Sequence, residues 1–192
     1  MIKSLFRRNH DFIEVYDNVL SKRDCEILIN QFEKSDDVSL ATTSSGYEPE
    51  FKKGRQLLCK FSHDNKISNI TRTGLNHCLN KYNEKYKSLH YCPRWSKHDG
   101  FMIQKYDGKD EGFKGWHCEH GPDENSSQRV LAWMFYLNDA KSGTEFMNFP
   151  TVNARMGRCL IWPSGWTHVH KGVIPNEGIK YVITGWISFT ND

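Results

Sequence analysis

The sequence of 192 residues lacks the features that mark membrane or secreted proteins. No stretch approaches the roughly 20 consecutive apolar residues that a membrane-spanning helix needs. Residues 1–8 are basic but contain no apolar run long enough for a signal peptide. The six cysteines are scattered and form no CxxC pair, which disfavours a zinc ribbon or a thioredoxin-type motif. We therefore expect a soluble cytoplasmic protein with reduced thiols and no membrane partner.

The sequence also lacks a large excess of charge of either sign. The 26 basic and 23 acidic residues nearly balance, leaving a formal net charge of +3. Such a balance provides no electrostatic footprint for nucleic acid, so we expect no nucleic-acid partner. The sequence has neither internal repeats nor low-complexity segments. With 38% hydrophobic and 13% aromatic residues, it is rich enough in apolar side chains to form one domain over residues 1–192.

Residues 1–99 have the character of a strand and helix support. A short strand is expected at 12–16. A helix follows, because Ser21 and Asp24 resemble a capping box and the next apolar residues recur at helical spacing. A second, longer helix is expected over 67–86, where the apolar positions keep the same period for about five turns. Between the helices, residues 35–54 lack periodicity and are expected to form a long exposed loop that could lie over a binding site, followed by a strand at 56–61.

Residues 100–190 have a different texture, in which short runs rich in β-branched and aromatic residues alternate with turn residues. This pattern predicts a mainly β fold with supporting helices. The expected architecture is a double-stranded β-helix, the jelly roll of cupin-like proteins, packed by the N-terminal helices, with a ligand site between its two sheets. The expected strands are 100–106, 115–119, 129–137, 144–149, 157–162, 167–173 and 180–189.

The candidate metal ligands begin with His117 and Glu119. On a strand, residues two apart point to the same face, so both side chains would enter one cavity while Cys118 and His120 point away. Two imidazoles and one carboxylate on one face of a metal are typical of non-haem Fe(II) oxygenases. An HxE pair alone is weak evidence, because a solvated polar strand face has the same pattern.

A third ligand must come from elsewhere, and His168 and His170 are both candidates because they would share a strand face. Lys180 begins the last expected strand on the same face as Thr184 and Trp186. An inward-facing lysine is costly to bury without an anion, so an anionic ligand would account for it. The alternative is a strand-end lysine whose ammonium reaches water.

Taken in order, the pieces between Met102 and Phe189 resemble the Fe(II)- and 2-oxoglutarate-dependent dioxygenases, most closely the prolyl 4-hydroxylase-like branch with its small phage and bacterial members. The matching pieces are Gln104-Lys105-Tyr106, Trp116-His117-Cys118-Glu119, Phe135-Tyr136-Leu137-Asn138, Gly143-Thr144-Glu145-Phe146, Pro150, Gly157, Leu160-Ile161-Trp162-Pro163-Ser164, His170-Lys171-Gly172-Val173, Lys180-Tyr181, Thr184 and Trp186. Many ordered pieces at compatible spacings are more specific than any single one.

The resemblance implies a role for each of these positions. His117, Glu119 and His170 would bind Fe(II), and Lys180 would pair with the far carboxylate of 2-oxoglutarate. His170 is preferred to His168 because the family places its lysine or arginine nine or ten positions after the distal histidine. The cosubstrate pocket would be lined by Tyr106, Tyr136, Thr144, Thr184 and Trp186, while His168 and Trp166 would lie on the substrate side. No catalytic residue is implied beyond the metal centre.

The implied reaction consumes 2-oxoglutarate and O2 at the iron and hydroxylates a substrate C–H, with release of succinate and CO2. The expected substrate is a peptidyl proline. Ascorbate could serve as reductant. The substrate could instead be a free amino acid or another protein side chain, so the expected partner is a peptide, a protein or a small molecule. The family usually has Asp where this chain has Glu119, and this departure favours a competing hypothesis, a jelly roll that binds a metal or an anion without catalysis. A zinc hydrolase would leave Tyr106, Thr144 and Lys180 without a purpose.

Overall fold

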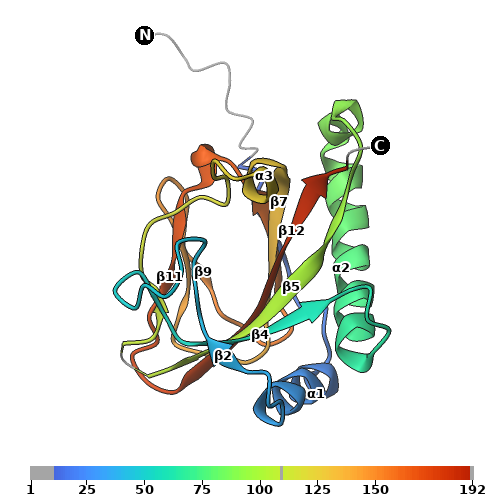
Figure 1. Cartoon of the computed structure of the whole chain (residues 1–192). Coiled ribbons are helices and arrows are strands. Elements are labelled where there is room, and N and C mark those ends of the chain that lie inside the picture. Colours follow the sequence, from blue (N-terminus) through green and yellow to red (C-terminus); the bar gives the residue numbers. More distant parts are fainter. Residues whose placement is uncertain (1–10, 109, 191–192) are drawn as a thin grey trace, which may run out of the picture.

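The computed structural model describes residues 11–108 and 110–190, and antiparallel pairing dominates it (Figure 1). The main sheet has seven strands. In spatial order these are β1 (Glu14–Tyr16), β10 (Cys159–Pro163), β7 (Arg129–Tyr136), β12 (Ile179–Phe189), β5 (Trp95–Asp107), β4 (Arg55–Lys60) and β2 (Ser39–Leu40). The second sheet contains β11 (His170–Val173), β8 (Gly143–Phe146) and β9 (Val152–Asn153), and a third pairing joins β3 (Lys52–Lys53) to β6 (Gly112–Phe113).

Strand alternation divides the side chains of the main sheet between two apolar layers. In β7, Trp133 and Phe135 join the large core cluster that includes the helices. Ala132, the residue before Trp133, faces the second sheet, where it packs with Phe146 and Trp162. The second sheet therefore packs on the face of the main sheet opposite to the helices. This arrangement confirms the predicted mainly β jelly roll with helical support.

Two helices cover the outer face of the main sheet, away from β9 and β11 (Figure 1). Helix α1 (Lys22–Glu33) begins at the predicted capping box, in which the Ser21 side chain accepts from the Asp24 backbone N–H at 3.1 Å. Helix α2 (Lys66–Lys85) is capped by Asn65. Its Gly74 is explained by close packing, since a Cβ there would lie 2.9 Å from a Leu20 methyl carbon. No helix among the described residues is long and apolar enough to cross a membrane.

Several predicted boundaries differ from the structure. Residues 115–119 form no strand and contribute only a bridge between His117 and His170. The predicted strand 167–173 begins as a 3-10 helix, η2 (Trp166–His168), and becomes β11 only at His170. Within 35–54, predicted to be exposed, Ala41 and Lys52 are buried. The remaining short helices are η1 (Lys87–Tyr91) and α3 (Glu124–Ser127). The interpretation of residues 1–8 lies outside the described residues.

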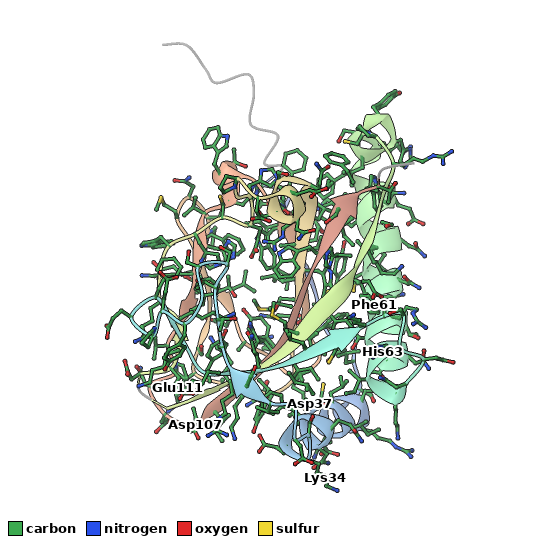
Figure 2. The ribbon with its side chains drawn as sticks, viewed as in Figure 1. Lys34, Asp37, Phe61, His63, Asp107 and Glu111 are labelled. Carbon is green, nitrogen blue, oxygen red and sulfur yellow. The ribbon has the colours of Figure 1, made fainter. Side chains whose placement is uncertain are left out.

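The end of β5 and the start of β6 lie close together at the edge of the fold. Figure 2 shows Asp107 and Glu111 near one another there, and the Asp107 backbone N–H donates to the Glu111 carboxylate at 2.8 Å. Gly108 has a φ of +75°, a left-handed conformation that favours glycine. Phe113, in β6, lies next to the histidine of the predicted HxE pair.

Candidate metal centre

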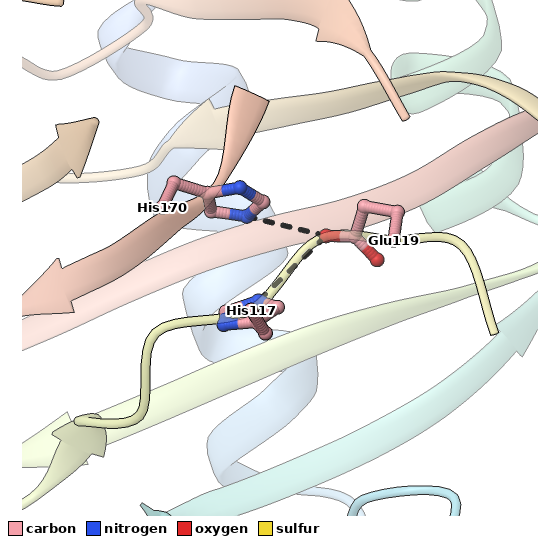
Figure 3. Close-up of side chains that lie close together, drawn as sticks. All are labelled: His117, Glu119 and His170. Atoms are coloured by element: carbon pink, nitrogen blue, oxygen red, sulfur yellow. Dashed lines mark ion pairs between the residues drawn. The ribbon is translucent and has the colours of Figure 1, made fainter. Parts of the chain in front are cut away.

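Three ligating side chains converge between the two sheets (Figure 3). Glu119 Oε1 lies 3.3 Å from His170 Nε2 and 3.9 Å from His117 Nε2. All the ligating atoms lie within 4.8 Å of one another. Atoms that each bind one ion at about 2 Å are separated by roughly 3 Å, so a small inward movement would complete the coordination. The donor set, two imidazoles and one carboxylate, fits Fe(II) with positions left open on the metal.

Backbone contacts rather than strand alternation orient these ligands. His117 and His170 exchange two backbone hydrogen bonds, at 2.9 and 2.8 Å, and the Glu119 N–H donates to the Ser164 carbonyl at 3.0 Å. His117 and Glu119 do converge, but the alternation along a strand that was predicted to bring them together is absent. A bend after an isolated bridge turns Glu119 toward the histidine pair.

Each histidine ring is fixed through its Nδ1. His117 Nδ1 lies 2.9 Å from the Gly115 carbonyl oxygen, and His170 Nδ1 lies 2.9 Å from the His168 carbonyl oxygen. With the proton on Nδ1 donated to the carbonyl, Nε2 of each ring keeps its lone pair for a metal. Phe113 stacks on the His117 ring, with centroids 3.6 Å apart and planes at 10°. The rings are thus held for ligation before any ion arrives.

The protonation states also suit a metal centre. Burial, together with the neighbouring His170, lowers the pKa of His117 to about 4, so this ring is neutral at pH 7. Burial alone would raise the pKa of Glu119, but its contacts with His170, His117 and Trp186 hold that pKa well below its usual range. A neutral imidazole and an ionised carboxylate are the forms that bind metals.

The second carboxylate oxygen of Glu119 has its own partners. Trp186 Nε1 donates to Glu119 Oε2 at 2.7 Å. Arg129 donates to the Glu119 carbonyl at 2.9 Å and lies 3.5 Å from Oε2, with its guanidinium 3.8 Å from the centroid of the Trp186 ring. These contacts fix the longer side chain of a glutamate at the place where the resembling family usually has aspartate.

A cavity of about 490 Å³ opens beside the three ligands. Four of the residues predicted for the cosubstrate pocket line it directly: Tyr106, Thr144, Thr184 and Trp186. Tyr136 is fully buried behind Thr144, and their hydroxyl oxygens lie 2.7 Å apart. The structure thus brings the predicted pocket residues to one place. It also gives Trp186 a contact, the hydrogen bond to Glu119, that the sequence did not indicate.

Lys180 also lines this cavity and is 3% exposed. Its ammonium donates to the Val173 carbonyl at 3.0 Å and lies 5.2 Å from the centroid of the Tyr106 ring. Burial lowers the pKa of Lys180 to about 8. No carboxylate lies within 4 Å of this ammonium in the described part of the chain. A buried cation without a counter-ion, facing a cavity, is suited to binding an anionic ligand.

Two residues predicted for the substrate side lie elsewhere. His168 is buried, with its Nε2 2.7 Å from the Asp11 carbonyl oxygen, and it does not line the cavity. Trp166 is 79% exposed and is likewise absent from the cavity wall. Cys118 and His120, which were expected to point away from the metal, also contribute to the cavity wall. These differences arise because neither 115–119 nor 167–173 forms the regular strand that was predicted.

Two further residues that line the cavity, Lys52 and Arg129, were not predicted from the sequence. Lys52 belongs to the segment interpreted as an exposed loop, and Arg129 lies at the start of β7. Neither belongs to a motif with a recognisable spacing. Pairing between Lys52 and Phe113 brings the former inward, and this contact spans residues far apart in the sequence.

Comparisons with known proteins agree with this geometry. Residues 101–188 match the family described as the 2OG-Fe(II) oxygenase superfamily. A comparison with curated proteins found no match. The solved structures that match include a Trichoplax adhaerens prolyl hydroxylase in complex with a hypoxia inducible factor peptide fragment, with a TM-score of 0.74 and 15% identity over 94% of this chain and 84% of that one.

Two further structural relatives are also prolyl hydroxylases. A viral collagen prolyl hydroxylase from Paramecium Bursaria Chlorella virus-1, in complex with 2OG, has a TM-score of 0.68 and 16% identity, covering 94% of this chain and 98% of the other. A Pseudomonas putida prolyl-4-hydroxylase has a TM-score of 0.70 and 11% identity, covering 93% and 94% respectively. At these identities the structural likeness establishes the jelly-roll fold.

Proposed function

We propose that this protein is an Fe(II)- and 2-oxoglutarate-dependent dioxygenase that hydroxylates a prolyl residue in a peptide or protein. Its residues 101–188 match the 2OG-Fe(II) oxygenase superfamily, whose members use Fe(II) and 2-oxoglutarate. The observation that carries the proposal is the convergence of His117, Glu119 and His170 beside a cavity that also contains the buried Lys180. Support for the substrate class comes from the structural relatives, one of which is in complex with a peptide.

In the proposed reaction, 2-oxoglutarate and O2 are consumed. One oxygen atom enters the substrate C–H bond, the other enters succinate, and CO2 is released. Bound Fe(II) and 2-oxoglutarate supply the oxidising chemistry. His117, Glu119 and His170 would hold the metal through two imidazoles and one carboxylate.

The other residues position and enclose the reactants. Lys180 pairs with the far carboxylate of 2-oxoglutarate and acts as neither an acid nor a base. The Tyr106 hydroxyl, which donates to Gln104 at 2.9 Å, and the Thr144 hydroxyl provide polar contacts along the same wall. Apolar side chains at the back of the cavity, including Trp162 and Val182, exclude water from the reacting centre.

Mass spectrometry tests the proposal. Fe(II)-loaded protein is incubated with 2-oxoglutarate, ascorbate and proline-containing peptides, and the products are examined for the gain of one oxygen atom on proline. The expected result is hydroxyproline together with an equal amount of succinate. Peptides in which every proline is replaced by alanine serve as the control. Oxygen incorporation that is equal in both peptide sets would refute the assignment of proline, and the absence of any incorporation would leave no support for hydroxylation.

A further inference from the structure

Lys52 is a second buried lysine in the wall of the cavity. It lies in β3, directly opposite Phe113 in β6, and is 3% exposed. Its ammonium donates to the Thr42 carbonyl at 3.0 Å and lies 5.2 Å from the centroid of the Phe113 ring. Gln56 holds Thr42 in place through hydrogen bonds to its backbone N–H and its hydroxyl, at 3.4 and 3.2 Å. The lysine is therefore anchored at the cavity wall and does not extend to water.

The environment of Lys52 leaves its charge without a counter-ion. An ammonium has three N–H donors, and within residues 11–108 and 110–190 only the hydrogen bond to Thr42 occupies one of them. No carboxylate in this part of the chain lies within 4 Å of it. Burying a cation without a paired anion is costly, and burial lowers the pKa of Lys52 to about 8. A structural role alone would not require a charged end at this place.

Lys52 and Lys180 have closely matching surroundings. Each is 3% exposed, donates one hydrogen bond at 3.0 Å to a backbone carbonyl, and lies 5.2 Å from the centroid of an aromatic ring. Both line the same cavity. They differ in one respect, since the charge of Glu119 acts on Lys52 whereas burial alone acts on Lys180. Lys52 thus lies on the side of the cavity that holds the metal ligands.

From this correspondence we propose that Lys52 forms a second carboxylate-binding point of the cavity, close to the metal ligands and distinct from the point at Lys180. The carboxylate has two possible sources, the metal-proximal end of 2-oxoglutarate or a carboxylate of the substrate. In the second case the substrate carries an acidic group near the carbon that is hydroxylated, such as the free carboxylate of a terminal proline. Only the substrate source rests on the proposed function.

The test uses binding rather than turnover. The variants are Lys52→Met, which removes the charge, and Lys52→Gln, which keeps an N–H donor for the Thr42 carbonyl. Lys53→Met is the matched control, because the neighbouring Lys53 is paired with Asp110 at 2.6 Å at the surface. Protein loaded with Mn(II) is titrated calorimetrically with 2-oxoglutarate. In a second titration, the complex with 2-oxoglutarate receives a proline-terminated peptide as the free acid or the amide.

The cosubstrate is the source of the carboxylate if both Lys52 variants lose about tenfold or more in 2-oxoglutarate affinity and Lys53→Met does not. An unchanged 2-oxoglutarate affinity with a similar loss for the acid peptide alone assigns the substrate. The proposal is overturned if folded Lys52 variants bind 2-oxoglutarate as wild type does and the acid peptide binds no better to wild type than to the variants. If neither variant folds, metal-free wild type decides. It should bind the acid peptide better than the amide, or 2-oxoglutarate better than its C1 amide, and the lack of a preference in both comparisons overturns the proposal. Failure of proline hydroxylation leaves the 2-oxoglutarate titration unaffected, so the two ideas fail separately.

Discussion

Replacing Lys180 by Met should stabilise the metal-free protein while abolishing its ability to bind 2-oxoglutarate tightly. Burial lowers the pKa of Lys180 from 10.5 to about 8, which corresponds to a cost of roughly 3 kcal/mol for keeping the charged form folded at neutral pH. The variant also loses the hydrogen bond to Val173 and the contact with the Tyr106 ring, each worth about 1 kcal/mol. The net expectation is a gain of about 1 kcal/mol in the free energy of unfolding, or about 3 °C in Tm.

The pH dependence identifies the cause of that gain. Because the folded-state pKa of Lys180 is depressed, the unfolded chain binds more protons between about pH 8 and 10.5, so wild-type stability rises with pH through this window. The advantage of Lys180→Met should therefore be full at about pH 7 and should shrink as the pH approaches 10. Thermal melts in the presence of a chelator at several pH values measure it. A variant that is less stable than wild type at pH 7, or an advantage independent of pH, would refute the reasoning.

Three further predictions concern the metal centre, and each is tested by calorimetric titration with Mn(II). Trp186→Phe removes the donor to Glu119 Oε2 and should weaken metal binding about 10- to 100-fold. Trp95→Phe, at the far end of β5, is the control and should have no effect. Equal metal affinities of the two variants would exclude this role for Trp186. His170→Ala should abolish metal binding. His168→Ala should preserve it, because the His168 ring is hydrogen-bonded to a backbone carbonyl. Equal loss of metal binding in both variants would contradict the choice of His170 as the ligand. Glu119→Asp withdraws the carboxylate by about 1.5 Å and should weaken metal binding by breaking the Trp186 contact; unchanged binding would show that the longer side chain is not needed.

Local signals were sufficient for much of the fold. Helix α1 begins where the Ser21 and Asp24 pair predicts, and the apolar period of 67–86 matches α2 to within a residue or two. Both features depend on contacts between residues three or four positions apart, which a sequence displays directly. The alternating runs at 129–137 and 180–189 likewise correspond to β7 and β12.

The site was harder to derive, because its geometry depends on contacts between distant segments. His117 and Glu119 were predicted to converge because they would alternate on a strand, but the structure has no strand there. Their convergence depends instead on the bridge to His170 and on the Ser164 carbonyl. Lys52 was missed for a related reason. Only its pairing with β6 turns it inward, and nothing in a polar, aperiodic stretch distinguishes a lysine that faces a cavity from one that faces water.

The most direct test of the account is the amount of succinate formed from 2-oxoglutarate by wild-type protein and by His170→Ala, assayed together with Fe(II), ascorbate and a pool of proline-containing peptides. The account predicts Fe(II)-dependent succinate from the wild type, matched by oxygen incorporated into peptide, and none above background from the variant. No succinate from metal-loaded wild type, or equal amounts from both proteins, would contradict it.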